Sequence, residues 1–219
     1  MRILAFDTAT PATVVALVGD GARAESRHDP EPGERPQHVQ RLLPLAAELL
    51  DAAGLAFADL DRIAVGTGPG TFTGLRIGVA TARALAQASG AELAGVSTLE
   101  ALAAAAAGED REVLAVLDAR RGEAFVGGAV PPAAVTPALL ADIARPGMLA
   151  VGDGAVRFRE VLETSGAEVP ADGSPLHRVS ALTVAELAAG APPTGRDVTP
   201  EYLRLPDAEI ALRERRAEP

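Results

Sequence analysis

The stretch from Gly66 to Gly78, GTGPGTFTGLRIG, is the part of the chain whose residue types most suggest chemistry, because a glycine-rich turn leading into a helix can bind phosphate. Its spacing fits neither common phosphate motif. A P-loop ends in Gly-Lys-Ser/Thr and the chain has no lysine, while the dinucleotide fingerprint needs a glycine where Thr71 stands. Glycines also permit close backbone approach, and Gly70, Gly74 and Gly78 recur every four residues. We therefore favour close packing over phosphate binding here.

Arg76 lies in the first turn of the helix that the apolar spacing predicts after this stretch. A cation is disfavoured there, because the helix dipole is positive at its N-terminal end. We expect the guanidinium to reach a carboxylate or another anion, or the aliphatic stem to cover apolar surface.

Asp7 ends the first predicted strand and is followed by Thr8 and Thr10. A carboxylate in this position could hold a magnesium ion through water, as in a phosphotransferase. It could instead accept a hydrogen bond from its own turn, as aspartates in turns often do. The second interpretation is favoured, because the rest of a nucleotide site is missing.

Metal and nucleophile chemistry can be tested by counting residues. The three histidines, His28, His38 and His177, are far apart, and the position four residues after His38 is Leu42, so no histidine pair forms on one helix face. The chain has no cysteine and no G-x-S-x-G motif. We expect neither a metal site nor nucleophilic hydrolysis.

The composition describes a globular, acidic protein. The 219 residues suffice for one large domain or two small lobes, and the net charge is −10 with a pI near 4.8. Such a charge repels phosphate and predicts that any contact with nucleic acid goes through a partner. The short basic segment Arg213 to Arg216 is the exception to this repulsion. No apolar run has the length of a signal peptide or a membrane span, so we expect a cytoplasmic protein.

Strands and helices alternate in the predicted first half. Strands are predicted over 2–7, 13–18, 62–68 and 91–97, with one more after residue 19, and helices over 38–53, 75–89 and 98–107.

The second half repeats the opening of the first. Residues 113–130 have the outline of residues 3–18: an apolar strand ending in aspartate, Asp118 or Asp7, then a polar turn and another strand. Helices over 137–143, 156–164 and 183–189 and a strand over 148–154 follow, and a proline-rich tail from residue 190 wraps back. This repeat predicts an α/β fold of two duplicated lobes, 1–108 and 109–219, the second reduced.

Four motifs occur in an order that resembles the TsaB (YeaZ) family. They are FDTAT (6–10), GPGTFTGLRIG (68–78), GVSTLEALA (95–103) and LDARRGEAFV (117–126), and the resemblance extends to about residue 130. Members of this family help to make N6-threonylcarbamoyladenosine at position 37 of tRNAs that read codons starting with A. The resemblance implies the duplicated fold of actin, Hsp70 and sugar kinases (the ASKHA fold).

The resemblance also implies a noncatalytic scaffold that forms a heterodimer with the transferase TsaD, joined by the ATPase TsaE, and that meets tRNA indirectly. A homodimer is open to the isolated chain, and ATP is expected only within the assembled complex. The implied partner-binding surface lies on the helices that begin near His38 and Gly74, and comprises His38, Leu42, Leu45, Leu49, Gly74, Leu75, Arg76, Gly78, Val79, Ala80 and Ala84.

Two departures argue against catalysis by this chain. The catalytic relative has a histidine pair on the helix that here carries His38 and Leu42, so its metal is not carried over. The relative's glycine-rich nucleotide turn is here Asp118 to Gly122, with two arginines. Asp7, Thr8 and Asp118 remain only as vestigial cofactor-binding candidates. The alternative function is an ATP-dependent phosphotransferase of the ASKHA type acting alone, and a peptidase would need the missing metal pair.

Overall fold

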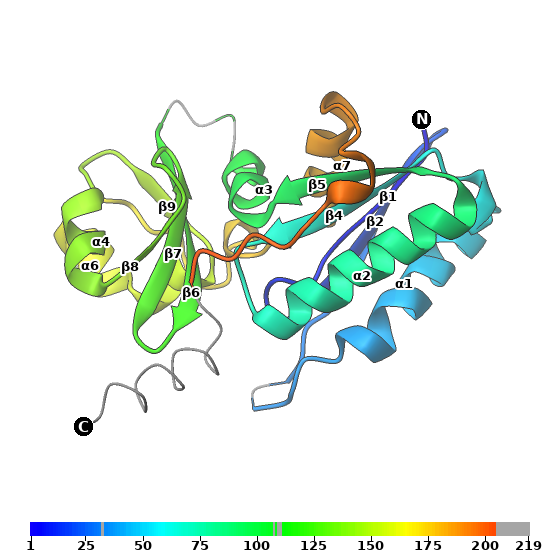
Figure 1. Ribbon diagram of the computed structural model, residues 1–219. Helices are drawn as coiled ribbons and strands as arrows, with labels where there is room; N and C mark the ends of the chain where they lie inside the picture. Colours follow the sequence, from blue (N-terminus) through cyan, green and yellow to red (C-terminus); the bar gives the residue numbers. More distant parts are fainter. Residues whose placement is uncertain (32, 107, 109–110, 205–219) are drawn as a thin grey trace, which may run out of the picture.

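The computed structural model contains two β-sheets, one in each of two lobes, and describes residues 1–31, 33–106, 108 and 111–204 (Figure 1). The first sheet has the strand order β3-β2-β1-β4-β5. β1, β2 and β3 are antiparallel neighbours, whereas β4 and β5 run parallel to β1. The strands are β1 (Ile3–Asp7), β2 (Thr13–Gly19), β3 (Ala22–His28), β4 (Arg62–Gly68) and β5 (Glu92–Ser97).

Alternation along β1 divides the core of the first lobe between the two faces of the sheet. Leu4 and Phe6 pack under α1 (His38–Ala53) and α2 (Phe72–Ser89), which lie side by side in Figure 1. Ile3 and Ala5 point to the opposite face, against α3 (Thr98–Ala105) and α7 (Ala181–Gly190). Both faces of the sheet are therefore covered by helices, as in other α/β folds.

The second sheet repeats the arrangement of the first with one strand fewer. Its order is β8-β7-β6-β9, with β6 antiparallel to β7 and parallel to β9. An isolated parallel bridge from Leu149 to Glu168 lies where the first sheet has its fifth strand. The elements of this lobe are β6 (Val113–Arg120), β7 (Glu123–Gly128), β8 (Ala133–Val135), α4 (Pro137–Ile143), β9 (Leu149–Val151), α5 (Asp153–Arg157) and α6 (Arg159–Thr164). The prediction of a duplicated α/β fold with a reduced second lobe is confirmed.

The C-terminal part of the described chain returns to the first lobe. α7 packs on β1 and β2, and beyond it the Thr194 amide donates to the Leu93 carbonyl at the edge of the first sheet. The predicted division into 1–108 and 109–219 therefore assigns α7 to the wrong lobe. This helix packs on one face of the first sheet and buries the apolar side chains there. Residues 109–110, at the division itself, lie outside the described residues.

Three short 3₁₀ helices complete the described elements: η1 (Phe57–Asp59), η2 (Pro175–His177) and η3 (Gly195–Asp197). In the described part of the chain, every helix is too short or too polar to cross a membrane.

Candidate functional site

Asp7 is fully buried at the turn between β1 and β2, and both of its carboxylate oxygens are used inside the chain. Oδ1 accepts a hydrogen bond of 2.7 Å from the Ala9 amide, and Oδ2 accepts one of 2.7 Å from the Thr98 hydroxyl. Burial raises the pKa of this carboxyl, and these two hydrogen bonds oppose the shift. The geometry matches an aspartate that organises its own turn and holds the first residue of α3.

The glycine stretch packs directly on this turn. A Cβ added at Gly66 would overlap the Asp7 carboxyl, one at Gly70 would overlap the Ala9 carbonyl, and one at Gly74 would overlap the Thr8 carbonyl. The Thr71 amide also donates to the Ala9 carbonyl at 2.7 Å. The predicted close backbone packing is confirmed at these three glycines.

His38 begins α1 and is buried, with only 3% of its surface exposed. Its Nδ1 lies 2.9 Å from the Thr13 hydroxyl, whereas Nε2 has no hydrogen-bond partner among the described residues. Burial lowers the pKa of His38, and His28 lowers it further, so the neutral imidazole is favoured. Leu42, four residues on, lies in the core of the first lobe. The described residues contain no group of three or more metal-ligating side chains.

Most of the predicted partner-binding residues prove to belong to the core. His38, Leu42, Gly74, Leu75, Gly78 and Val79 are buried, and Leu45 and Leu49 pack partly buried against the same core. The reason is physical: the apolar stripe of a helix covers its own sheet before it can meet another subunit. Of the predicted set, Arg76, Ala80 and Ala84 are exposed.

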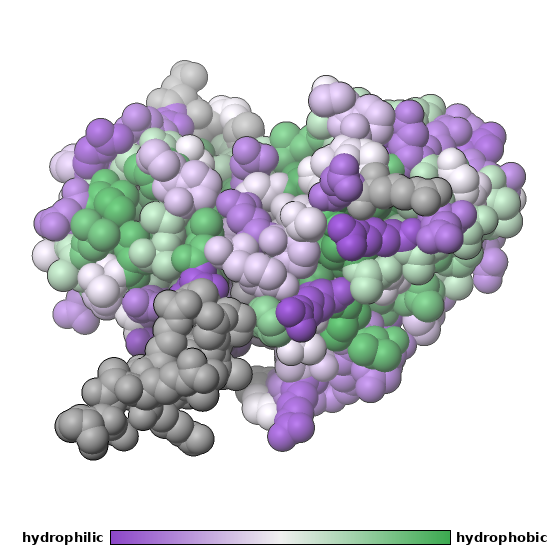
Figure 2. Space-filling view, viewed as in Figure 1, coloured by the Kyte–Doolittle hydropathy of each residue, from purple (hydrophilic) through white to green (hydrophobic). Residues whose placement is uncertain are grey.

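Two exposed apolar residues on α1 were missed by the sequence interpretation. Val39 and Leu43 are 69% and 47% exposed. Because they are four residues apart, Val39 and Leu43 share a face of α1. Each follows a buried residue, so this face turns away from the sheet. Figure 2 shows hydrophobic side chains among polar ones over α1 and α2. The outer face of these helices, defined here by Val39, Leu43, Arg76, Ala80 and Ala84, is called the helix face below.

The turn of the second lobe that corresponds to the Asp7 turn is occupied by arginines. Asp118 Oδ2 accepts hydrogen bonds from Arg120 at 3.2 Å and from Arg157 at 3.1 Å, and the Asp118 amide donates to Asp153 at 3.1 Å. Burial raises the pKa of the Asp153 carboxyl. Arg120 and Arg121 have positive φ values of 64° and 51°, which non-glycine residues rarely adopt. Asp118 is therefore engaged by side chains of its own lobe.

The C-terminal segment 198–204 crosses from the first lobe to the second. Val198 is buried in the first core, and the Glu201 amide donates to the Thr67 carbonyl at 2.7 Å. Leu203 packs against a cluster that joins α3 to the second sheet, and Arg204 pairs with Glu123 of β7 at 3.0 Å. A cavity of about 220 Å³ also lies between the lobes, lined in part by Thr10, Arg27, Asp153 and His177.

Comparisons with known proteins give a consistent result. A family model described as TsaD, tRNA N6-adenosine threonylcarbamoyltransferase, matches residues 30–154. The chain is 42% identical over 127 residues to the tRNA threonylcarbamoyladenosine biosynthesis protein TsaB of Escherichia coli, which is 57% of this chain and 53% of that protein. The chain thus matches about half the length of that relative.

Two further comparisons extend over nearly the whole chain. An uncharacterized protein of Mycobacterium tuberculosis is 36% identical over 223 residues, 94% of this chain and 93% of that one. The crystal structure of an uncharacterized protein with similarity to the peptidase YeaZ, from Pseudomonas aeruginosa, superimposes with a TM-score of 0.75 at 32% identity, and the match covers 93% of this chain and 99% of that one.

Proposed function

Because the chain belongs to the TsaB (YeaZ) family, we propose that it is a noncatalytic subunit in the synthesis of N6-threonylcarbamoyladenosine in tRNA. In this role it forms a heterodimer with the transferase TsaD, which transfers the threonylcarbamoyl group to N6 of adenosine 37. The subunit acts in the cytoplasm, and the ATPase TsaE joins the pair.

The helix face is the observation that carries this proposal. Val39 and Leu43 expose apolar side chains on α1, and Ala80 and Ala84 are exposed small residues on α2. Small side chains let a partner helix approach closely, and exposed apolar surface on a soluble protein commonly marks a protein contact. Without TsaD, the same face can join two copies of this chain.

Three features support a role without chemistry in this chain. The Asp7 carboxylate is engaged by Ala9 and Thr98, and the glycines of residues 66–78 pack on the turn instead of surrounding a phosphate. Leu42 is a core residue where the metal pair of a catalytic relative would need a histidine. We assign ATP to the assembled complex and no intrinsic cofactor to the chain.

The charge supports an indirect contact with tRNA. With a net charge of −10, the chain as a whole repels a polyanion. The tRNA is therefore held by the complex, chiefly through other subunits.

Co-purification with TsaD from the same organism tests the proposal. We expect a stable heterodimer in size-exclusion chromatography, and no ATP binding by the isolated chain in isothermal titration calorimetry. ATP binding by the chain alone, together with failure to form a complex with TsaD, would favour the ASKHA-type phosphotransferase acting alone.

A further inference from the structure

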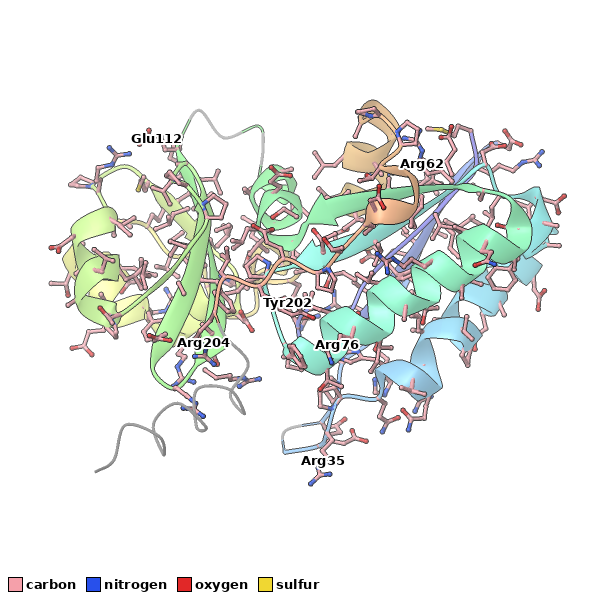
Figure 3. The ribbon with its side chains drawn as sticks, viewed as in Figure 1. Arg35, Arg62, Arg76, Glu112, Tyr202 and Arg204 are labelled. Carbon is pink, nitrogen blue, oxygen red and sulfur yellow. The ribbon has the colours of Figure 1, made fainter. Side chains whose placement is uncertain are left out.

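An arginine and two aromatic rings form a cluster at the start of α2, and Figure 3 labels two of its members, Arg76 and Tyr202. The Arg76 guanidinium carbon lies 3.9 Å from the centre of the Phe72 ring, and the Arg76 Nε–H donates to the Tyr202 hydroxyl at 3.3 Å. The rings of Phe72 and Tyr202 are 5.2 Å apart at an interplanar angle of 35°. Tyr202, the one tyrosine of the chain, is 43% exposed. Phe72, Arg76 and Tyr202 are called the aromatic–arginine cluster below.

The segment that supplies Tyr202 is anchored on both sides. The neighbouring Glu201 amide is hydrogen-bonded to Thr67 in the first lobe, and Arg204 is paired with Glu123 in the second. The Tyr202 ring is thus held in place before any partner arrives. A pre-positioned side chain loses less entropy on binding than a free one, which favours a role in recognition.

Arg76 has no carboxylate partner among the described residues. Its contacts are the Phe72 ring and the Tyr202 hydroxyl, and the first turn of α2 contains no acidic residue. Because α2 begins at Phe72, Arg76 lies in its second turn and not in the first turn, where the sequence analysis placed it. Tyr202 uses only the Nε–H, so the two terminal nitrogens keep their donors in the planar arrangement that matches a carboxylate. Of the two alternatives expected for Arg76, an anion partner is absent among the described residues, whereas the contact with the Phe72 ring fits the second, a side chain that covers apolar surface.

The position of Arg76 indicates which kind of anion fits. Arg76, Ala80 and Ala84 are all exposed and are spaced four residues apart, so they lie along one side of α2. The partner that covers the two alanines in the proposed heterodimer can therefore also carry the group that reaches Arg76. A nucleic acid fits less well, because the exposed alanines beyond the arginine offer it no donor and the chain is strongly acidic.

We propose that the aromatic–arginine cluster extends the helix face, and that the partner subunit places an Asp or Glu carboxylate on Arg76. This inference rests on the proposed pairing with TsaD. The contact combines one arginine, one tyrosine and an aromatic support, the residue types that contribute most to protein interfaces. It also brings the C-terminal segment 198–204 into the interface, which the helices alone would not.

The test measures the dissociation constant of the heterodimer for full-length variants, without RNA. Replacing Arg76 by glutamine (Arg76→Gln) should weaken association about tenfold or more, the loss typical of an interface hot spot. Tyr202→Phe keeps the ring but removes the hydroxyl that orients Arg76, and should cost about fivefold. Arg76→Gln should also flatten the salt dependence of association, since it removes a charge pair.

Arg145→Gln is the matched control, because it also removes one exposed arginine. Arg145 pairs with Glu112, which lies far from Arg76 in Figure 3. This variant should bind TsaD within about twofold of the wild type. Thermal melts of each free variant separate loss of binding from loss of folding. If Arg76→Gln proves unstable, Tyr202→Phe tests the same contact in its place.

Three outcomes overturn the inference. If Arg76→Gln and Arg145→Gln associate with TsaD equally well, the cluster is not in the interface. If Arg76→Gln weakens only RNA binding by the assembled heterodimer, the anion belongs to the nucleic acid. If the wild-type chain does not associate with TsaD at all, the proposed function fails and this inference fails with it.

Discussion

The Thr8 hydroxyl donates a hydrogen bond of 2.8 Å to the Gly74 carbonyl, joining the turn between β1 and β2 to the first turn of α2. Both residues are fully enclosed, and the glycine has no side chain that would hold the two backbones apart. The contact fixes where α2 begins and therefore where Arg76 and the two exposed alanines stand on the surface.

Replacing Gly74 by alanine should destabilise the chain by about 1–3 kcal/mol, because the new methyl group would overlap the Thr8 carbonyl and force the helix away. Gly190→Ala is the control, since a Cβ there meets nothing within 4 Å. Urea unfolding of both variants measures the difference in the free energy of unfolding. Equal stability of the two would show that α2 does not need this close approach.

Replacing Ala80 or Ala84 by glutamate should leave the thermal melt of the isolated chain almost unchanged, because both side chains are exposed. In the heterodimer each change adds bulk and an unpaired buried charge, so association should weaken by an amount on the order of 2–5 kcal/mol. Ala138→Glu, on an exposed position of α4 in the other lobe, is the control. Unfolding of the free Ala80 and Ala84 variants would instead place this side of α2 in the core.

Asp7 should make stability depend on pH in a defined direction. Its pKa is raised in the folded chain, so its contribution is fully present below the ordinary carboxyl pKa and is lost as pH rises through the raised value. The Asp7→Asn variant keeps an oxygen for the Ala9 amide but does not titrate. Compared with this variant, the wild type should lose stability as the pH rises above the ordinary carboxyl pKa of about 4. Parallel stability curves for the two proteins would contradict the expectation.

The isolated chain should bind tRNA weakly or not at all near physiological salt, because its net charge is −10. A mobility-shift titration against the TsaD heterodimer measures the difference. Micromolar or tighter binding by the chain alone would show that its positive charge is concentrated on one surface.

The repeat of a strand, an aspartate, a turn and a second strand predicted the topology correctly, because Asp7 and Asp118 mark equivalent hairpins. The errors in the bounds of single helices and strands come from the residues at those positions. α2 begins at Phe72 and not at residue 75, since the glycines at the start of the stretch were interpreted as a turn. The single helix predicted over 156–164 is two helices that meet at Phe158, and β8 was missed because its short alanine-rich sequence follows two prolines.

The site was harder to predict than the fold, for a reason visible on α1. The regular spacing of Leu42, Leu45 and Leu49 indicates a buried stripe but not which surface buries it, and here it is the helix's own sheet. The exposed pair Val39 and Leu43 gives no periodic signal of its own. Tyr202 meets Arg76 across 126 residues, a contact that no local pattern specifies.

The return of α7 to the first sheet has a consequence for how the chain is made. Arg62 of β4 donates to the carbonyls of Ala188 and Ala191, which locks the end of α7 onto strands synthesised well over a hundred residues earlier. During translation, α3 is available early to cover part of the sheet face that carries Ile3 and Ala5, but the part that α7 covers stays exposed until α7 has left the ribosome. The first lobe therefore completes its core only after the second lobe has been synthesised.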